Sequence, residues 1–150
     1  MSQDDTGIHL ETSIGYLLKE TASALRASME AVLRPLGMTV THYSCLELLA
    51  QRPGLSNSEL ARGTFVTRQS MNVLLQALER DGSVTRATEP SVGKALPTQL
   101  TDSGRRSLAQ ASAAIRGVEQ RMLADLTDDQ QTEARRILRS MVASLHSQAR

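Results

Sequence analysis

The chain has 150 residues, a formal net charge of +1, one cysteine, and aromatic residues at only 2% of its positions. This length allows one domain with a real core but is short for two enzyme domains, and a lone cysteine excludes an intrachain disulfide. The scarcity of aromatic side chains argues against single-stranded nucleic-acid binding, which stacks bases on rings, whereas duplex binding needs only a local basic surface.

Two helices are predicted over the first third of the chain. Apolar residues recur at helical spacing from Thr12 to about Arg34, and Pro35 and Gly37 end this first helix. A second helix, from about Thr41 to Gln51, ends before the sequence Arg52-Pro53-Gly54.

The next two helices are short and closely spaced. Ser56 with Glu59 has the sequence of a capping box and opens a brief helix that ends near Gly63. Thr67 can cap the following helix, which Gly82 ends. Apolar residues of that helix fall at i, i+3, i+4 and i+7 and predict one buried side, made of Met71, Leu74, Leu75 and Leu78.

The periodicity changes after Gly82. Ser83–Thr88 and Ala95–Leu100 are predicted to be two short strands joined by a tip at Glu89–Lys94. Because Pro97 cannot donate to a ladder, we expect this hairpin to be an edge ribbon.

Two longer helices follow the ribbon. One starts at Thr101-Asp102 and runs to about Asp125, and the last opens with the capping-box sequence T-D-D-Q, Thr127 to Gln130. The fold class predicted from these elements is mainly α with a small two-stranded β-wing. The last helix carries an apolar stripe of Ile137, Leu138, Met141, Val142 and Leu145.

The polar side of the helix after Thr67 is the strongest functional signal. A solvated face usually carries Glu and Lys, but here the side chains are Arg68, Gln69, Asn72 and Gln76. A B-DNA major groove accepts one helix, and pairing of Arg with guanine, or of Asn and Gln with adenine, discriminates bases by about 1–3 kcal/mol each. Thr67 and Ser70 are expected to donate to phosphate and fix the register. Two short helices followed by a ribbon have the order of a winged helix-turn-helix, so we predict a recognition helix that binds double-stranded DNA.

Dimerisation follows from the apolar stripes of the first and last helices. The central winged helix is too small to cover both, so a symmetric partner is predicted. Two-fold symmetry would place the two recognition helices about 34 Å apart, which fits a palindromic operator. Packing of these helices only on each other within one chain is the alternative. The expected interface residues are Ile14, Leu17, Ile137, Met141, Val142 and Leu145.

These ordered segments resemble the MarR family of winged helix-turn-helix transcriptional regulators. The resemblance covers nearly the whole chain and is carried by I-G-Y-L-L-K-E, L-R-P-L-G-M-T, L-E-L-L-A-Q-R-P-G-L-S-N-S-E-L-A, V-T-R-Q-S-M-N-V-L-L-Q-A-L-E-R-D-G-S-V-T-R, L-T-D-S-G-R-R-S-L and L-T-D-D-Q. It implies a single domain over residues 1–150, with a winged helix-turn-helix at about 39–101 and dimerisation helices at 10–36 and 102–148. It also implies a homodimeric repressor of a palindromic operator, relieved by a small aromatic or phenolic ligand or by an oxidant.

The wing departs from the pattern of this family. Members commonly carry an Asp-Arg pair there, and the corresponding positions look like Val92 and Gly93. Lys94 at the tip and Arg86 at the base are the basic residues expected to contact DNA. Because Lys acts only as a point charge, insertion into a narrow groove is weakened, and we expect base specificity to rest mainly on the recognition helix.

An effector site is expected near the second helix, where relatives in this family have a crevice. Its candidate lining residues are Tyr16, Arg26, His42 and Tyr43, with the Arg pairing with a carboxylate. Ordinary packing and surface roles are the alternative for all four side chains.

Two other functions compete with ligand-relieved repression. Cys45 would be the switch of a redox-sensing regulator, but it lies among aliphatic residues with no resolving cysteine, which favours an inert thiol. A helical dimer adaptor that does not bind DNA would not need Arg, Gln and Asn clustered on one helix.

Several classes of protein are excluded by what the sequence lacks. No apolar run approaches the ~20 residues that span a membrane, and Met1–Gly7 is polar and acidic, so we expect a cytoplasmic protein without a membrane partner. His9, His42 and His146 are scattered, so neither a metal site nor a cofactor is predicted. The motifs G-x-S-x-G, Walker A and H-E-x-x-H are missing, so we expect no enzyme.

Overall fold

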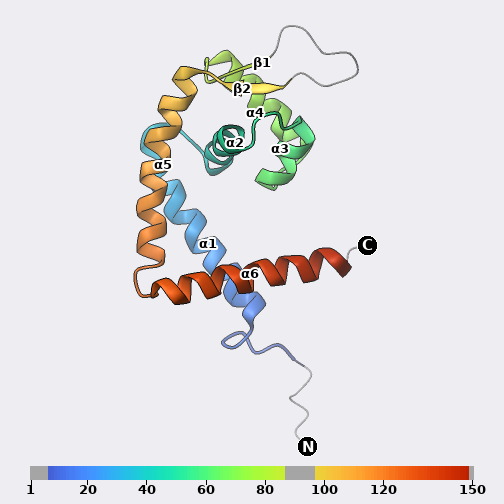
Figure 1. The fold of residues 1–150 in the computed structure, drawn as a ribbon, viewed down its shortest axis with the longest axis vertical. Helices are drawn as coiled ribbons and strands as arrows, with labels where there is room; N and C mark the ends of the chain where they lie inside the picture. Colours follow the sequence, from blue (N-terminus) through green and yellow to red (C-terminus); the bar gives the residue numbers. More distant parts are fainter. Residues whose placement is uncertain (1–6, 87–96, 149–150) are drawn as a thin grey trace, which may run out of the picture. The chain divides into compact units, whose positions relative to one another are not determined.

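The computed structural model describes residues 7–86 and 97–148, and the chain divides into two compact units, Met1–Arg116 and Gly117–Arg150. The elements, coloured along the chain in Figure 1, are α1 Ile14–Leu33, a 3-10 turn at Arg34–Leu36, α2 Val40–Gln51, α3 Asn57–Thr64, α4 Arg68–Arg80, β1 Val84–Arg86, β2 Thr98–Leu100, α5 Asp102–Met122 and α6 Asp128–Gln148. The mainly helical class with a two-stranded ribbon is confirmed.

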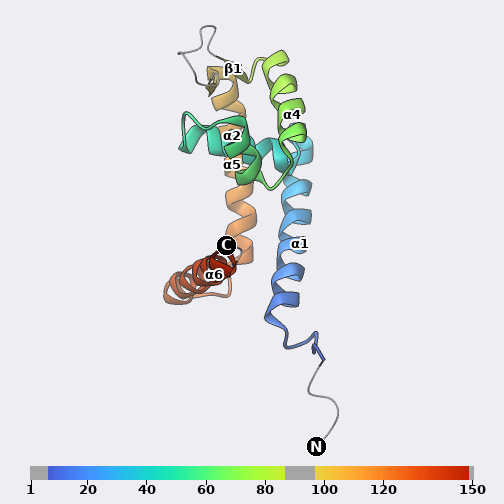
Figure 2. The ribbon, with the colours of Figure 1, turned by 90° about the vertical axis from the view of Figure 1, so that its right-hand side faces the viewer.

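The first unit is built around an aliphatic core beneath α4. Figures 1 and 2 show α2, α3 and α4 gathered at one end of α1, together with the ribbon and the start of α5. The side chains in this core come from all of these elements and include Leu33, Cys45, Leu46, Leu60, Met71, Leu75, Leu78, Val84, Leu100 and Ala111. This shared core fixes which side of α4 is buried.

Side-chain caps set most helix starts. Ser56 Oγ accepts from the Glu59 N–H at 3.1 Å while Glu59 Oε1 accepts from the Ser56 N–H at 3.1 Å, so the predicted capping box is present. Thr67 Oγ1 caps α4 by accepting from the Ser70 N–H at 3.0 Å. The second helix starts slightly earlier than predicted, because Thr39 caps it at the His42 N–H.

Left-handed residues end several elements. Gly37 has φ 72° after the 3-10 turn, and Gly82 has φ 82° after α4, as the predicted stops require. Phe65, just after α3, adopts φ 61° without being glycine. This residue forms the tight turn between α3 and α4.

The ribbon is antiparallel, and its described pairs lie inside the two predicted strands. Val84 pairs with Leu100 and Arg86 with Thr98, so the described ladder has three residues in each strand. Pro97 lies just before β2, outside the ladder, in agreement with its lack of an N–H. The predicted tip, with Lys94, lies outside the described residues.

The second unit holds the end of α5 and the whole of α6. Helix α5 ends at Met122, a little before the predicted Asp125. The second capping box is confirmed, since Thr127 Oγ1 accepts from the Gln130 N–H at 3.1 Å and Gln130 Oε1 accepts from the Thr127 N–H at 2.9 Å. In the part of the chain that the structure describes, no helix is both long and apolar enough to cross a bilayer.

Candidate nucleic-acid interface

Helix α4 has one buried side and one exposed side. Met71, Leu75 and Leu78 are 0%, 0% and 1% exposed, so they fix the rotation of the helix about its axis. The predicted polar side chains then point to solvent, and all four are exposed: Arg68, Gln69, Asn72 and Gln76. These four side chains are therefore available to the edges of bases in a groove.

The first turn of α4 is organised by two hydroxyl groups. The Thr67 hydroxyl caps the helix and also donates to Ser70 Oγ at 3.0 Å. The only hydroxyl proton of Thr67 is thus engaged within the turn, whereas Ser70 is exposed and accepts this bond. Of the two predicted phosphate donors, Ser70 is the better placed to donate outward.

A contact between helices involves one of the predicted base readers. Asn57 Nδ2, at the start of α3, donates to Asn72 Oδ1 at 2.7 Å. Sequence reasoning missed Asn57, because no periodicity links two residues on different helices. The order of the two helices was the only available signal.

Val73 is a second residue on the exposed side of α4 that sequence reasoning missed. It is 60% exposed, although it is apolar and lies beside Asn72. A valine methyl group is the kind of partner that the C5-methyl group of thymine contacts in a major groove. At helical spacing Val73 falls on the same side of α4 as the exposed polar residues, so the sequence pattern could have predicted its exposure.

Arg86 lies at the base of the wing but is held against α4. Its Nε is 3.5 Å from Glu79 Oε2, and its side chain is 28% exposed. The ion pair ties β1 to the last turn of α4, so contact with DNA would require this guanidinium to use its remaining N–H groups. Its role toward DNA stays a prediction, as does that of Lys94.

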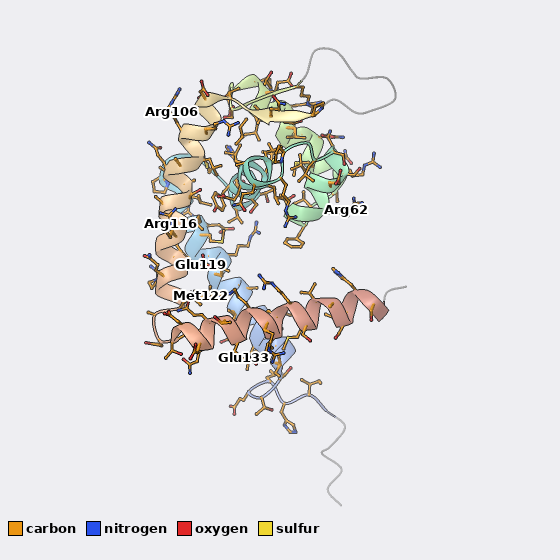
Figure 3. The ribbon with its side chains drawn as sticks, in the orientation of Figure 1. Arg62, Arg106, Arg116, Glu119, Met122 and Glu133 are labelled. Carbon is orange, nitrogen blue, oxygen red and sulfur yellow. The ribbon has the colours of Figure 1, made fainter. Side chains whose placement is uncertain are left out.

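Two arginines of the first unit lie far from each other. Figure 3 shows Arg62 on α3 and Arg106 on α5 at opposite sides of the unit. These two charges therefore do not add to one surface, and the exposed side of α4 is notable for its hydrogen-bonding groups.

The four candidate ligand residues have different surroundings. Arg26 Nε lies 3.1 Å from Glu30 Oε1 on the exposed side of α1, so its guanidinium is already paired. His42 is partly buried, and this burial lowers its pKa, an effect that Asp81 opposes. Tyr16 is exposed and Tyr43 packs against the core. The exposed, paired Arg26 and the partly buried His42 thus lie in different environments.

Tyr43 belongs instead to a hydrogen-bonded group around Glu47. Ser112 Oγ donates to Glu47 Oε2 at 2.8 Å and thereby links α5 to α2. Burial alone would raise the pKa of Glu47, but hydrogen bonds from Gln51, Tyr43 and Ser112 outweigh it and lower the pKa overall. The charged carboxylate thus connects the helix that carries His42 with α5.

Cys45 lies in the core of the first unit. It is fully buried, its Sγ is 3.8 Å from Met71 Sδ, and burial raises its pKa to about 12. A protonated, inaccessible thiol is a poor nucleophile, so the geometry weighs against the redox-sensing alternative. Among residues 7–86 and 97–148, no group of three or more His, Cys, Asp or Glu side chains could hold a metal ion.

The predicted dimer residues lie at the surface of the single chain. Ile14 and Leu17 on α1 are exposed, as are Ile137, Val142 and Leu145 on α6, and Met141 is partly exposed. Such apolar rows on long helices are costly in water and are typical of an interface.

Comparisons with known proteins agree on one family. A MarR family model matches residues 36–95. The HTH-type transcriptional repressor Rv2887 of Mycobacterium tuberculosis is 42% identical over 135 residues, which is 90% of this chain and 97% of that protein.

Solved structures give the same result. The crystal structure of the Mycobacterium tuberculosis MarR family protein Rv2887 in complex with salicylic acid is 43% identical, covers 87% of this chain and 96% of that one, and has a TM-score of 0.72. The structure of Rv2887 in complex with DNA is 40% identical, covers 87% of this chain and 98% of that one, and has a TM-score of 0.70.

Proposed function

This chain belongs to the MarR family of transcriptional regulators, and we propose that it is a sequence-specific repressor that binds double-stranded DNA through α4. The observation that carries this proposal is the exposed side of α4, where guanidinium and amide groups are held outward by a fully buried opposite side. The DNA complex of the similar protein Rv2887 supports the same use of the fold. Because a transcriptional repressor acts on chromosomal DNA, the proposed function places this protein in the cytoplasm.

The acting species is a homodimer on a palindromic operator. Exposed apolar rows on α1 and α6 support this, since a symmetric partner would cover them. In this arrangement residues 39–101 form the winged helix-turn-helix, and residues 10–36 and 102–148 form the dimer. An adaptor without DNA binding would leave the polar side of α4 unexplained.

A small aromatic or phenolic ligand relieves repression. The structure of the similar protein Rv2887 with salicylic acid supports this proposal. Such a ligand can lower the affinity for DNA by no more than the ratio of its own affinities for the two dimer conformations. In this chain Arg26 would have to exchange Glu30 for the carboxylate of the ligand. Isothermal titration with salicylate should release heat, and operator affinity should fall when salicylate is bound. No heat with aromatic acids would remove this ligand class.

DNA binding itself is tested with duplexes carrying the promoter of the protein's own gene. Affinity should fall steeply with salt, because each phosphate contact releases counterions. Asn72→Ala should weaken the footprint at a specific site much more than it weakens binding to random duplex, and Lys94→Ala should reduce affinity for both. A footprint that survives Asn72→Ala but is lost in Lys94→Ala would contradict readout by α4.

A further inference from the structure

The contact between Asn57 and Asn72 joins two helices at the exposed edge of the interface. Asn57 Nδ2 donates to Asn72 Oδ1 at 2.7 Å across 15 positions of sequence. Asn57 is partly buried at the first position of α3, whereas Asn72 is exposed on the second turn of α4. Helices α3 and α4 pack against each other, as Figure 1 shows.

Asn57 is not needed for the start of its own helix. Ser56 is the N-cap of α3, and its capping box with Glu59 supplies partners for the N–H groups of Ser56 and Glu59 without any part of the Asn57 side chain. The side chain of Asn57 is therefore left for an interhelical role, and the bond to Asn72 is the one it makes among the described residues.

This bond restrains the side chain of Asn72 and, in the structure, sets which end of its amide meets α3. The terminal torsion of an asparagine is broad and roughly two-fold, so an unsupported amide can present either its oxygen or its nitrogen to a partner. Because Asn57 donates to Oδ1, the oxygen of Asn72 turns toward α3 and its NH₂ group turns away from Asn57. One lone pair of Oδ1 is used, and the other stays available.

We propose that Asn57 is a positioning residue for base recognition, which holds the amide of Asn72 in the orientation that reads adenine. In the paired geometry of Asn with adenine, the amide nitrogen donates to N7 while the amide oxygen accepts from the N6 amino group. The donors of Asn72 Nδ2 and the second lone pair of Oδ1 satisfy both requirements at once. This inference rests on the proposed DNA-binding function and adds a residue outside the recognition helix to it.

The experiment begins by selecting a preferred operator from a pool of random duplexes with the wild-type protein. Each base pair of the selected half-site is then replaced in turn, and affinities are measured by competition for wild type, Asn57→Ala, Asn72→Ala and the double variant. The matched control is Ser58→Ala, which alters the neighbouring polar side chain on α3 and leaves the amide pair intact.

Asn57→Ala should lower the preference for adenine about threefold to tenfold, at one position of the half-site only, as expected for loss of one hydrogen bond. Asn72→Ala should remove the preference at that same position, and the double variant should be no worse than Asn72→Ala, because Asn57 acts through Asn72. Affinity for random duplex and the thermal midpoint should match wild type in Asn57→Ala and in the Ser58→Ala control.

Asn57→Asp separates positioning from a purely structural role. A carboxylate accepts but cannot donate, so the Asn72 amide should rotate and turn Nδ2 toward residue 57, leaving both lone pairs of Oδ1 for the base. The preference at that position should then shift from adenine toward cytosine, whose N4 amino group is a donor. The added negative charge lowers affinity for every duplex alike, so the measured quantity is the ratio of the affinities for adenine and cytosine, which a purely structural role would leave unchanged.

The outcomes distinguish this inference from the function on which it rests. A wild-type protein that enriches no sequence from the pool would overturn both. An operator whose base preferences depend on Asn72 but stay unchanged in Asn57→Ala and Asn57→Asp would overturn the positioning role alone.

Discussion

Cys45 shows how burial decides the chemistry of a single side chain. Its pKa of about 12, against the ordinary 9.0, leaves about a thousandfold less thiolate at neutral pH. We therefore expect the native protein to react with a disulfide reagent at least about a thousandfold more slowly than the protein unfolded in denaturant, as followed by absorbance. Peroxide should leave operator affinity unchanged. Rapid labelling of the native protein would show that the thiol is accessible.

Phe65 lies in a conformation that its side chain does not favour. It has φ 61° and is 93% exposed, so the ring contributes little packing to offset the strain of a left-handed residue. Phe65→Gly should raise the free energy of unfolding by about 0.5–1 kcal/mol, because glycine adopts this φ freely. Urea unfolding measures the change. Phe65→Ala is the control, since it removes the ring but keeps Cβ, and equal effects of both changes would place the cost in the ring.

Residues of the interface were predictable where one helix determines them. The helical period alone placed Gln69, Asn72 and Gln76 on the exposed side of α4, since Met71 and Leu75 had to be buried. A partner from another helix, such as Asn57, could not be predicted, because the packing of α3 on α4 sets which side chains meet. The engagement of Arg86 by Glu79 depends in the same way on how the ribbon folds against α4.

Gly104 lets the first turn of α5 approach the base of the wing. A Cβ at this position would lie 2.1 Å from the backbone oxygen of Ser83, which cannot move without disturbing the ribbon. Gly104→Ala should therefore lower the free energy of unfolding by about 2–3 kcal/mol, measured by circular dichroism in urea. Gly117→Ala on the same helix is the matched control, because nothing lies within 4 Å of its Cβ, and it should stabilise by up to about 1 kcal/mol. Equal effects at both positions would contradict a steric cause.

Elements were predicted best where a cap or a stop lies close in sequence. The Ser56 and Thr127 capping boxes and the Gly82 stop are local, and each lies where the sequence indicated. The described pairs of the ribbon, Val84–Arg86 with Thr98–Leu100, lie inside the two predicted strands. The end of α5 was predicted a little late, because no Gly or Pro follows Met122 to mark it.

At the scale of the whole molecule, apolar residues lie exposed on α1 in the first unit and on α6 in the second. Leu145 on α6 is 74% exposed and Ile14 on α1 is 60% exposed, at opposite ends of the sequence. Nothing in local periodicity distinguishes a row that faces a core from one that faces a partner. The sequence thus predicted which residues are apolar and on one side, and the structure adds that they are accessible.

Dimerisation should fail when charge is placed in the α6 row. Leu145→Asp would bury a carboxylate in each half of a symmetric interface, and we expect the dissociation constant of the dimer to rise on the order of a hundredfold, measured by sedimentation. Ala143→Asp, on the opposite side of α6, adds the same charge at an exposed position and should leave the dimer intact. Because a palindrome is read by two linked recognition helices, operator affinity should fall in Leu145→Asp while weak binding to a single half-site is retained. If Leu145→Asp leaves the dimer as stable as Ala143→Asp does, the dimer interface does not include this row of α6.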